Sequence, residues 1–175
     1  MPKSRVLLSL AARRLWRQRL HGRRHQPRYS SRQVVVSLLG AVIAFVVLGA
    51  GGLIVAPFGA TAVLLFGNPG SPLAQPRNVV LRSCVAALVS VGCVQLLGSA
   101  AWVMGLAVGR TIALGQLLRC LHPPAGAMAV LGVMLKAKLS YLLFPVLPGA
   151  LLMVLSATAY HRLSGLGHRY PVHWL

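Results

Sequence analysis

The chain has 175 residues, of which 57% are hydrophobic, and it carries 18 Lys and Arg but no Asp or Glu. Such apolar content with few charges is typical of a membrane protein and excludes an ordinary soluble domain. The missing carboxylates exclude the intramembrane Asp or Glu sites of many cation-coupled carriers, sites for hard metal ions and most acid–base hydrolases.

The N-terminal segment is strongly basic. Residues 1–32 hold ten of the 18 cations, which by the positive-inside rule places the N-terminus in the cytoplasm. We therefore divide the chain into a basic cytoplasmic tail, 1–32, and a transmembrane domain, 33–175. A helix lying on anionic lipid, an organelle transit peptide and a nucleic-acid-binding arm are alternatives for the tail. No removable secretory signal is expected.

Four apolar runs are long enough to cross a bilayer, which takes about 20 residues: 33–55, 79–98, 100–119 and 139–160. Between the first two and between the last two lie apolar stretches of only about ten residues, which suits re-entrant or broken half-helices. Four crossings return the C-terminus, with Arg162 and Arg169, to the side of the N-terminus.

The two short stretches resemble each other. Residues 57–64, PFGATAVL, match residues 124–131, PAGAMAVL, at six of eight positions with an offset of 67. The sequence therefore predicts an all-α membrane protein with four transmembrane helices, two short re-entrant or broken half-helices and an internal two-fold repeat. Two crossings per copy would make the copies parallel.

Each short stretch begins with proline, the residue favoured at the first position of a helix. Gly59 and Gly126 would let a backbone or a small ligand approach. Since a helix start offers unpaired N–H groups and partial positive charge, two starts facing one cavity would bind an anion. The alternative is that both are packed helix breaks, with the glycines serving close contact.

Two other residues call for an explanation within an apolar chain. Arg110 lies ten residues into the third run and has no acidic partner in the sequence, so we expect it to face a wet cavity, a bound anion, backbone carbonyls or a partner subunit, or else to snorkel to the interface. His122 either exchanges a proton near neutral pH or bonds a backbone carbonyl. Cys84, Cys93 and Cys120 lack metal-site spacing, and no catalytic motif is present. We expect neither an enzyme nor a metal or other cofactor.

Three stretches resemble the signatures of the HPP family of small integral membrane proteins, which is named for a His-Pro-Pro triplet: FGATAVLLFGNPGSPLAQPRN at 58–78, LHPPAGA at 121–127 and RYPVHW at 169–174. The resemblance implies four spans, and plastid and cyanobacterial members are regarded as nitrite transporters. It also implies pathway residues. With Arg110 added because of its position in the third run, the candidate site residues are Gly59, Thr61, Asn68, Ser71, Gln75, Arg77, Asn78, His122, Pro123, Pro124, Gly126 and Arg110.

The sequence departs from the family pattern at several positions. Leu81, Arg82 and Ser83 stand where a Gly-Gly-His stretch is usual, Arg110 replaces a neutral residue, and Met128-Ala129 replaces a more polar pair. We expect a transporter or channel for a small inorganic anion, with nitrite first. The expected setting is the bacterial inner membrane, or alternatively the plastid inner envelope, as a homo-oligomer without nucleic acid. The rival function is a non-transporting scaffold or accessory subunit.

Overall fold

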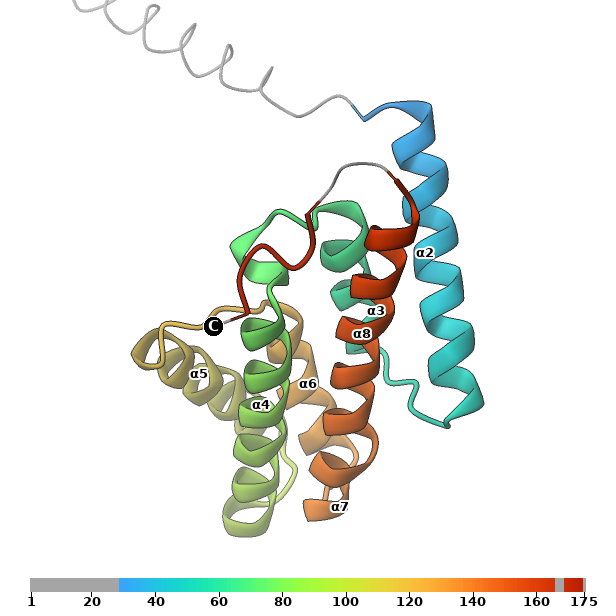
Figure 1. Cartoon of the computed structure of the whole chain (residues 1–175). Helices are drawn as coiled ribbons and strands as arrows, with labels where there is room; N and C mark the ends of the chain where they lie inside the picture. The colour runs from blue at the N-terminus through green and yellow to red at the C-terminus, as the bar shows by residue number, and fades with distance from the viewer. Residues whose placement is uncertain (1–28, 166–168, 175) are drawn as a thin grey trace, which may run out of the picture. The chain divides into compact units, whose positions relative to one another are not determined.

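The computed structural model describes residues 29–165 and 169–174. The chain divides into two units, Met1–Ser31 and Arg32–Leu175, and almost all of the basic tail lies outside the described residues. The described part is helical and contains no strand (Figure 1).

The first half of the described chain contains two long helices with a short one between them. Helix α2 spans Ser31–Ala50 and ends at the turn of Gly52, whose φ of +65° suits glycine. Helix α3, Pro57–Ala62, starts at a proline and continues into the π-helical turn η1, Val63–Gly67. After the 3-10 turn η2, Pro72–Ala74, helix α4 spans Pro76–Leu97.

The second half has the same order of elements. Helix α5 spans Ala101–Leu117 and α6 spans Pro124–Met134. The last run is divided into α7, Leu139–Tyr141, the turn η3, Leu142–Val146, and α8, Leu147–Leu163. The helix is interrupted at Phe144, whose φ and ψ of −159° and 117° are not helical, directly before Pro145.

Three helical segments are long and apolar enough to cross a membrane: Ser31–Ala50, Pro76–Leu97 and Leu139–Leu163. The third expected span, 100–119, forms the 17-residue helix α5, which measures about 25 Å at 1.5 Å per residue. It is shorter because the chain turns at Gly98, with φ +81°, and re-enters a helix only at Ala101, and because it turns again at Arg119, with φ +50°.

The direction of the helices differs from the expected topology. Tyr160 donates to the carbonyl of Val36 at 2.8 Å, so the end of α8 lies beside the start of α2. Arg77 donates to the carbonyl of Leu118 at 3.2 Å, so the start of α4 lies beside the end of α5. Helices α2 and α4 run the same way, whereas α5 and α8 run the opposite way (Figure 1).

Residues 51–67 therefore carry the chain back along α2 before α4 begins. Eleven helical residues rise about 16 Å and six non-helical residues reach about 20 Å, enough together to match a bilayer core of about 30 Å. The short helix α3 therefore lies alongside α2 and brings the chain back to the end at which α2 began, instead of leaving it at the other end. The expectation of parallel halves is wrong, because α5 runs opposite to α2.

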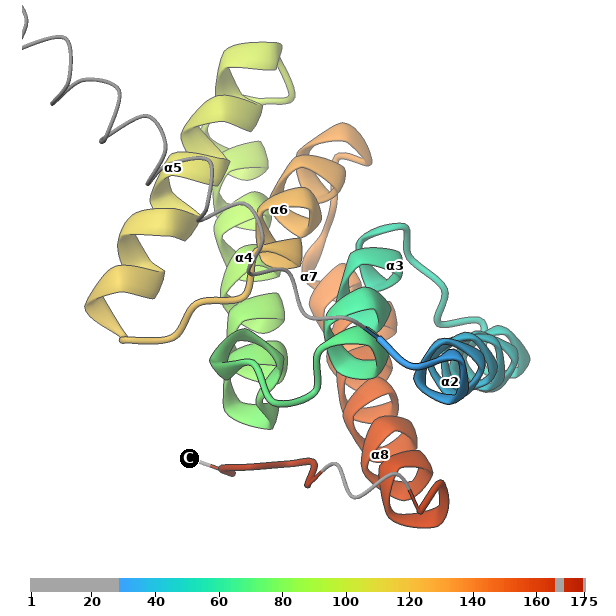
Figure 2. The same ribbon diagram turned by 90° about the horizontal axis from the view of Figure 1, so that it is seen from above.

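The two short helices lie inside the bundle. Helix α6 contacts α3, α4 and α5, and α3 also contacts α8 (Figure 2). Small residues permit these contacts: a methyl group at Gly132 in α6 would meet Ser90 in α4, and one at Gly149 in α8 would meet Phe58 in α3. Helix α2 presents an exposed apolar face that includes Val35, Leu38 and Val46, as expected for contact with lipid.

Candidate functional site

The histidine of the His-Pro-Pro triplet joins the two halves of the chain. His122 lies in the loop between α5 and α6 and is 1% exposed. Its Nδ1 lies 2.9 Å from the carbonyl oxygen of Leu73, and its Nε2 lies 3.0 Å from Oγ1 of Thr61 in α3. Since a carbonyl can only accept, Nδ1 carries the proton, and Nε2 of the neutral ring accepts from the Thr61 hydroxyl.

Burial lowers the pKa of His122 to about 4, against the hydrogen bond to Leu73, which raises it, while the nearby Arg82 guanidinium lowers it further. The ring is therefore neutral at physiological pH. Of the two roles considered from the sequence, the structure has the bond to a backbone carbonyl. A proton exchange near neutral pH does not fit a pKa of about 4.

A buried arginine lies close enough to His122 for their charges to interact. Arg82 sits in the second turn of α4 and is 2% exposed. Its Nε and Nη1 have no hydrogen-bond partner within the described residues. Buried cations are normally paired, and this chain contains no acidic side chain.

Glycine creates the space for this guanidinium. A methyl group at Gly115 in α5 would lie 2.6 Å from Nη1 and 2.7 Å from Nη2 of Arg82, so the guanidinium lies directly against the backbone of α5. Any larger residue at Gly115 would displace it.

Two buried hydroxyls near this contact also lack partners. Thr111 is one turn before Gly115 on the same face of α5, Ser83 follows Arg82 in α4, and neither Oγ is bonded within the described part. This is unusual, because Ser90 and Thr158 donate to backbone carbonyls of their own helices. Together with Arg82, these side chains give α4 and α5 hydrogen-bonding capacity that the described protein does not use.

The starts of the short helices differ from what the sequence suggested. The amides of Phe58 and Gly59 donate to the carbonyls of Val55 and Ala56. In α6, the amides of Ala125 and Gly126 do the same with His122 and Pro123. The expected unpaired N–H groups are therefore occupied, because the turn that precedes each helix supplies acceptors.

Several candidate residues instead brace the loop between η1 and α4. Buried Gln75 donates to the carbonyls of Pro69, at 3.1 Å, and Ser71, at 2.8 Å, while its Oε1 accepts from the amides of Val172 and His173. Asn78 donates to Pro72 at 2.7 Å, and the Ser71 hydroxyl accepts from Leu73. The backbone carbonyl of exposed Asn68 accepts from the amide of Ser71.

The remaining candidates do not meet at His122. Arg77 and Pro123 are exposed, Pro124 is buried, and Gly59 and Gly126 have open space where a Cβ would stand. Arg110 is exposed on α5, donates to Sγ of Cys93 at 3.6 Å and lines a groove of about 380 Å³. Thr61 and His122 are thus brought together, whereas Arg77 and Arg110 lie elsewhere.

The sequence reasoning missed Arg82 as a site residue. It noticed Arg82 only as a departure from the family pattern. An arginine inside an apolar run of a chain without Asp or Glu indicates a functional residue. Arg82 meets this criterion as Arg110 does, because it lies in the run 79–98. No group of three or more potential metal ligands occurs in the described ranges.

The fold is that of an α-helical membrane protein, with three helical segments in the described chain that are long and apolar enough to cross a bilayer. A sequence model of the HPP transmembrane region matches residues 25–171, and the chain belongs to this family. Two transmembrane proteins of Dictyostelium discoideum are each 37% identical, over 129 and 125 residues, which cover 69% and 67% of this chain. These residues make up 45% and 40% of the relatives, so the match spans less than half of their length. No solved structure matches.

Proposed function

We propose that the protein is a membrane transporter or channel for a small inorganic anion, and that Arg82 binds the anion. The observation that carries this proposal is the buried guanidinium of an acid-free chain, whose Nε and Nη1 find no hydrogen-bond partner in residues 29–165 and 169–174. A buried charge without a partner costs several kcal/mol, and an anion that accepts from both nitrogens offsets this cost.

The chemistry of the guanidinium favours a small planar anion. The guanidinium lies against the backbone of Gly115, one turn after the hydroxyl of Thr111, which is unbonded within the described residues, on the same face of α5. A guanidinium binds carboxylate-like oxygens through two parallel hydrogen bonds, and nitrite offers two such oxygens. Nitrite is the first candidate because family members are regarded as nitrite transporters.

We take the two halves of the chain to be copies of opposite orientation, which favours transport over the rival scaffold function. The turn bond from the Leu53 amide to the Leu48 carbonyl recurs, 67 residues later, from Cys120 to Gly115. The bonds that begin α3 recur at the same offset at the start of α6. Helices α2 and α5, which would correspond, run in opposite directions (Figure 1). Inverted halves with broken helices near the binding site are common in secondary transporters.

We further propose that α5 is the fourth full span and that both termini are cytoplasmic, in the bacterial inner membrane or alternatively the plastid inner envelope. The start of α2 and the tail 169–174 lie at the same end of the described unit (Figure 1). Assembly into a homo-oligomer would cover Arg110, which is exposed in the middle of α5. The proposal includes no catalytic activity and no cofactor.

The test is anion flux into liposomes that contain the purified protein, with nitrite, nitrate, formate and chloride compared. Arg82→Gln is expected to lower nitrite flux about tenfold or more, because a hydrogen bond to a charged group contributes about 1.5–3 kcal/mol. Gly115→Ala keeps the charge but moves the guanidinium, so it should also lower the flux.

Arg119→Gln is the matched control, because Arg119 is an exposed arginine in the neighbouring turn. It should retain the flux of the original protein, and helical circular dichroism should be equal in all variants. Flux equal to that of empty vesicles, from folded protein, would favour a scaffold. Full activity of Arg82→Gln would remove Arg82 from the pathway.

A further inference from the structure

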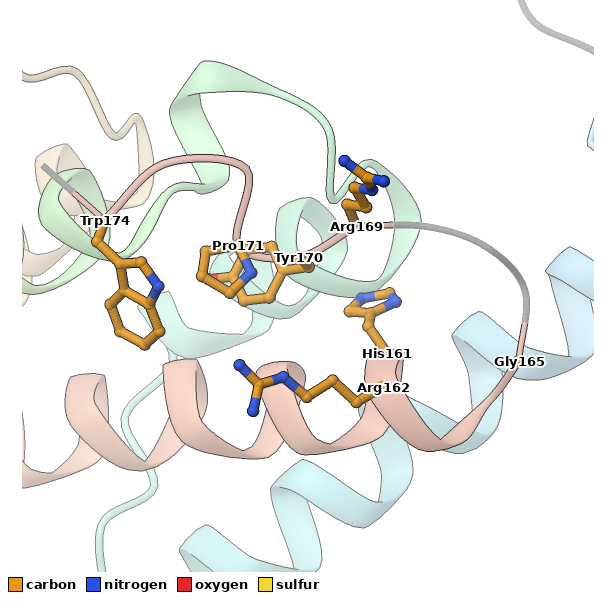
Figure 3. Close-up of a pocket in the computed structure, with 7 residues that line it drawn as sticks. All are labelled: His161, Arg162, Gly165, Arg169, Tyr170, Pro171 and Trp174. Atoms are coloured by element: carbon orange, nitrogen blue, oxygen red, sulfur yellow. The ribbon is translucent and has the colours of Figure 1, made fainter.

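A second basic site lies at the end of α8. The last turn of this helix and the C-terminal tail line an open pocket of about 590 Å³ (Figure 3). Its lining combines cationic and aromatic side chains: His161, Arg162, Gly165, Arg169, Tyr170, Pro171 and Trp174. It is separate from the Arg82 region, which lies between α4 and α5.

The walls of this pocket are held by several hydrogen bonds. Tyr170 donates to the carbonyl of Ala74 at 2.9 Å, and Gln75 binds the amides of Val172 and His173. His161 Nε2 donates to the carbonyl of Leu65 at 2.7 Å, and its ring stacks on Phe66. The tail therefore keeps a defined position over α8.

The arginines of the pocket are available to a ligand. Figure 3 shows Arg162 extending between α8 and the tail toward Trp174, while Arg169 projects from the tail. Neither guanidinium makes a hydrogen bond to the described protein. The carbonyls of Tyr160 and His161 near the end of α8 accept from Ser164, so they do not engage these arginines. Arg32 adds a third charge, because its Nη2 lies 4.0 Å from the Cβ position of Gly165.

The surroundings of the pocket are both polar and apolar. It lies at the end of a helix able to span a membrane, and beside it Leu163 is 85% exposed and Trp174 is 55% exposed. Tryptophan and tyrosine are enriched at the headgroup level of membranes, and basic pockets at helix ends bind anionic headgroups. Free phosphate would make no use of exposed Leu163 and Trp174.

We propose that this pocket binds the phosphate of an anionic phospholipid headgroup, with Arg162 as its ligand and Trp174 against the glycerol and first acyl carbons, while Arg169, which points away from Arg162, adds positive charge at the edge of the pocket (Figure 3). Arg presents paired donors that match phosphate oxygens.

The test measures binding to the full-length purified protein in neutral detergent. Short-chain phosphatidylglycerol, short-chain phosphatidylcholine and inorganic phosphate are titrated separately. The protein should bind phosphatidylglycerol more tightly than either of the others. Arg162→Gln/Arg169→Gln should weaken that binding about tenfold or more, on the scale of one charge-assisted hydrogen bond, and the single variant Arg162→Gln should weaken it less.

Lys136→Gln/Lys138→Gln is the control, since it removes two charges that line another pocket. It should leave phosphatidylglycerol affinity unchanged. Equal losses in both double variants would show unspecific attraction to the cationic chain and overturn the proposal. Inorganic phosphate binding as tightly as the lipid would also overturn it, in favour of a soluble phosphate ligand.

Discussion

Individual buried groups carry most of the chemical information in this chain. Arg82 and His122 are both almost completely buried, yet the ring nitrogens of His122 have partners, whereas Nε and Nη1 of Arg82 have none in the part of the chain that the structure describes. A satisfied buried histidine stabilises the fold, whereas an unsatisfied buried arginine lowers stability unless a ligand joins it. The two neighbours therefore have different expected effects when they are replaced.

The pKa of His122 predicts a loss of stability in acid. Its folded pKa of about 4 lies below the ordinary value of 6.5, so the stabilisation is complete above pH 6.5 and is lost as the pH falls toward 4. The expected loss is roughly 2 kcal/mol between pH 6.5 and 5, at 1.36 kcal/mol per pH unit.

Thermal unfolding in detergent at pH 7 and pH 5 checks this prediction. His122→Gln should show a smaller difference between the two pH values than the original protein. His173→Gln, which removes an exposed histidine, should keep the full difference. Equal pH dependence in all three proteins would contradict the burial of a neutral ring.

At the scale of elements, close approach of α4 and α6 depends on Gly132. Its hypothetical Cβ would meet Oγ and Cβ of Ser90, so Gly132→Ala is expected to force the helices apart and destabilise the protein by about 1–3 kcal/mol. Gly109→Ala is the matched change in α5, where nothing lies within 4 Å. It should stabilise by up to about 1 kcal/mol through helix propensity. Unfolding midpoints that fall equally would count against the packing argument.

The hydrogen bonds of Gln75 connect the loop between η1 and α4 to the C-terminal tail, residues 169–174. Gln75→Leu removes two donated and two accepted hydrogen bonds, each contributing about 0.5–1.5 kcal/mol. We expect faster hydrogen exchange in residues 169–174 and in the η2 turn. Asn68→Ala, at an exposed position of the same loop, should leave exchange in the tail unchanged. Slow exchange of the tail in Gln75→Leu would show that other contacts suffice.

At the scale of the whole molecule, the sequence predicted the kinds of elements better than their directions. Proline at 57 and 124 correctly marked the starts of both short helices, because that preference is local. Hydropathy does not distinguish a re-entrant short helix from a short helix that continues the path of an extended segment. In both cases the sequence contains an apolar stretch of only about ten residues. The interruption at Phe144 and Pro145 was missed because the surrounding run is uniformly apolar.

The candidate site was predictable only in part. Thr61 and His122 were named from the sequence, and they meet across 61 positions. Gln75, Ser71 and Asn78 bond backbone groups of the loop between η1 and α4. These roles were not predictable, because no residue pattern reveals the positions of backbone groups. Arg82 was undervalued because its burial depends on Gly115 in another helix, a pairing that only the folded chain discloses.

The two hydrogen bonds of His122, which we call the His122 latch, connect the two halves of the chain. His122 belongs to the later half, yet both of its ring nitrogens engage the earlier one, at Leu73 and Thr61. Any rocking of one half against the other must open this latch, at a cost of only about 1–3 kcal/mol for two neutral bonds.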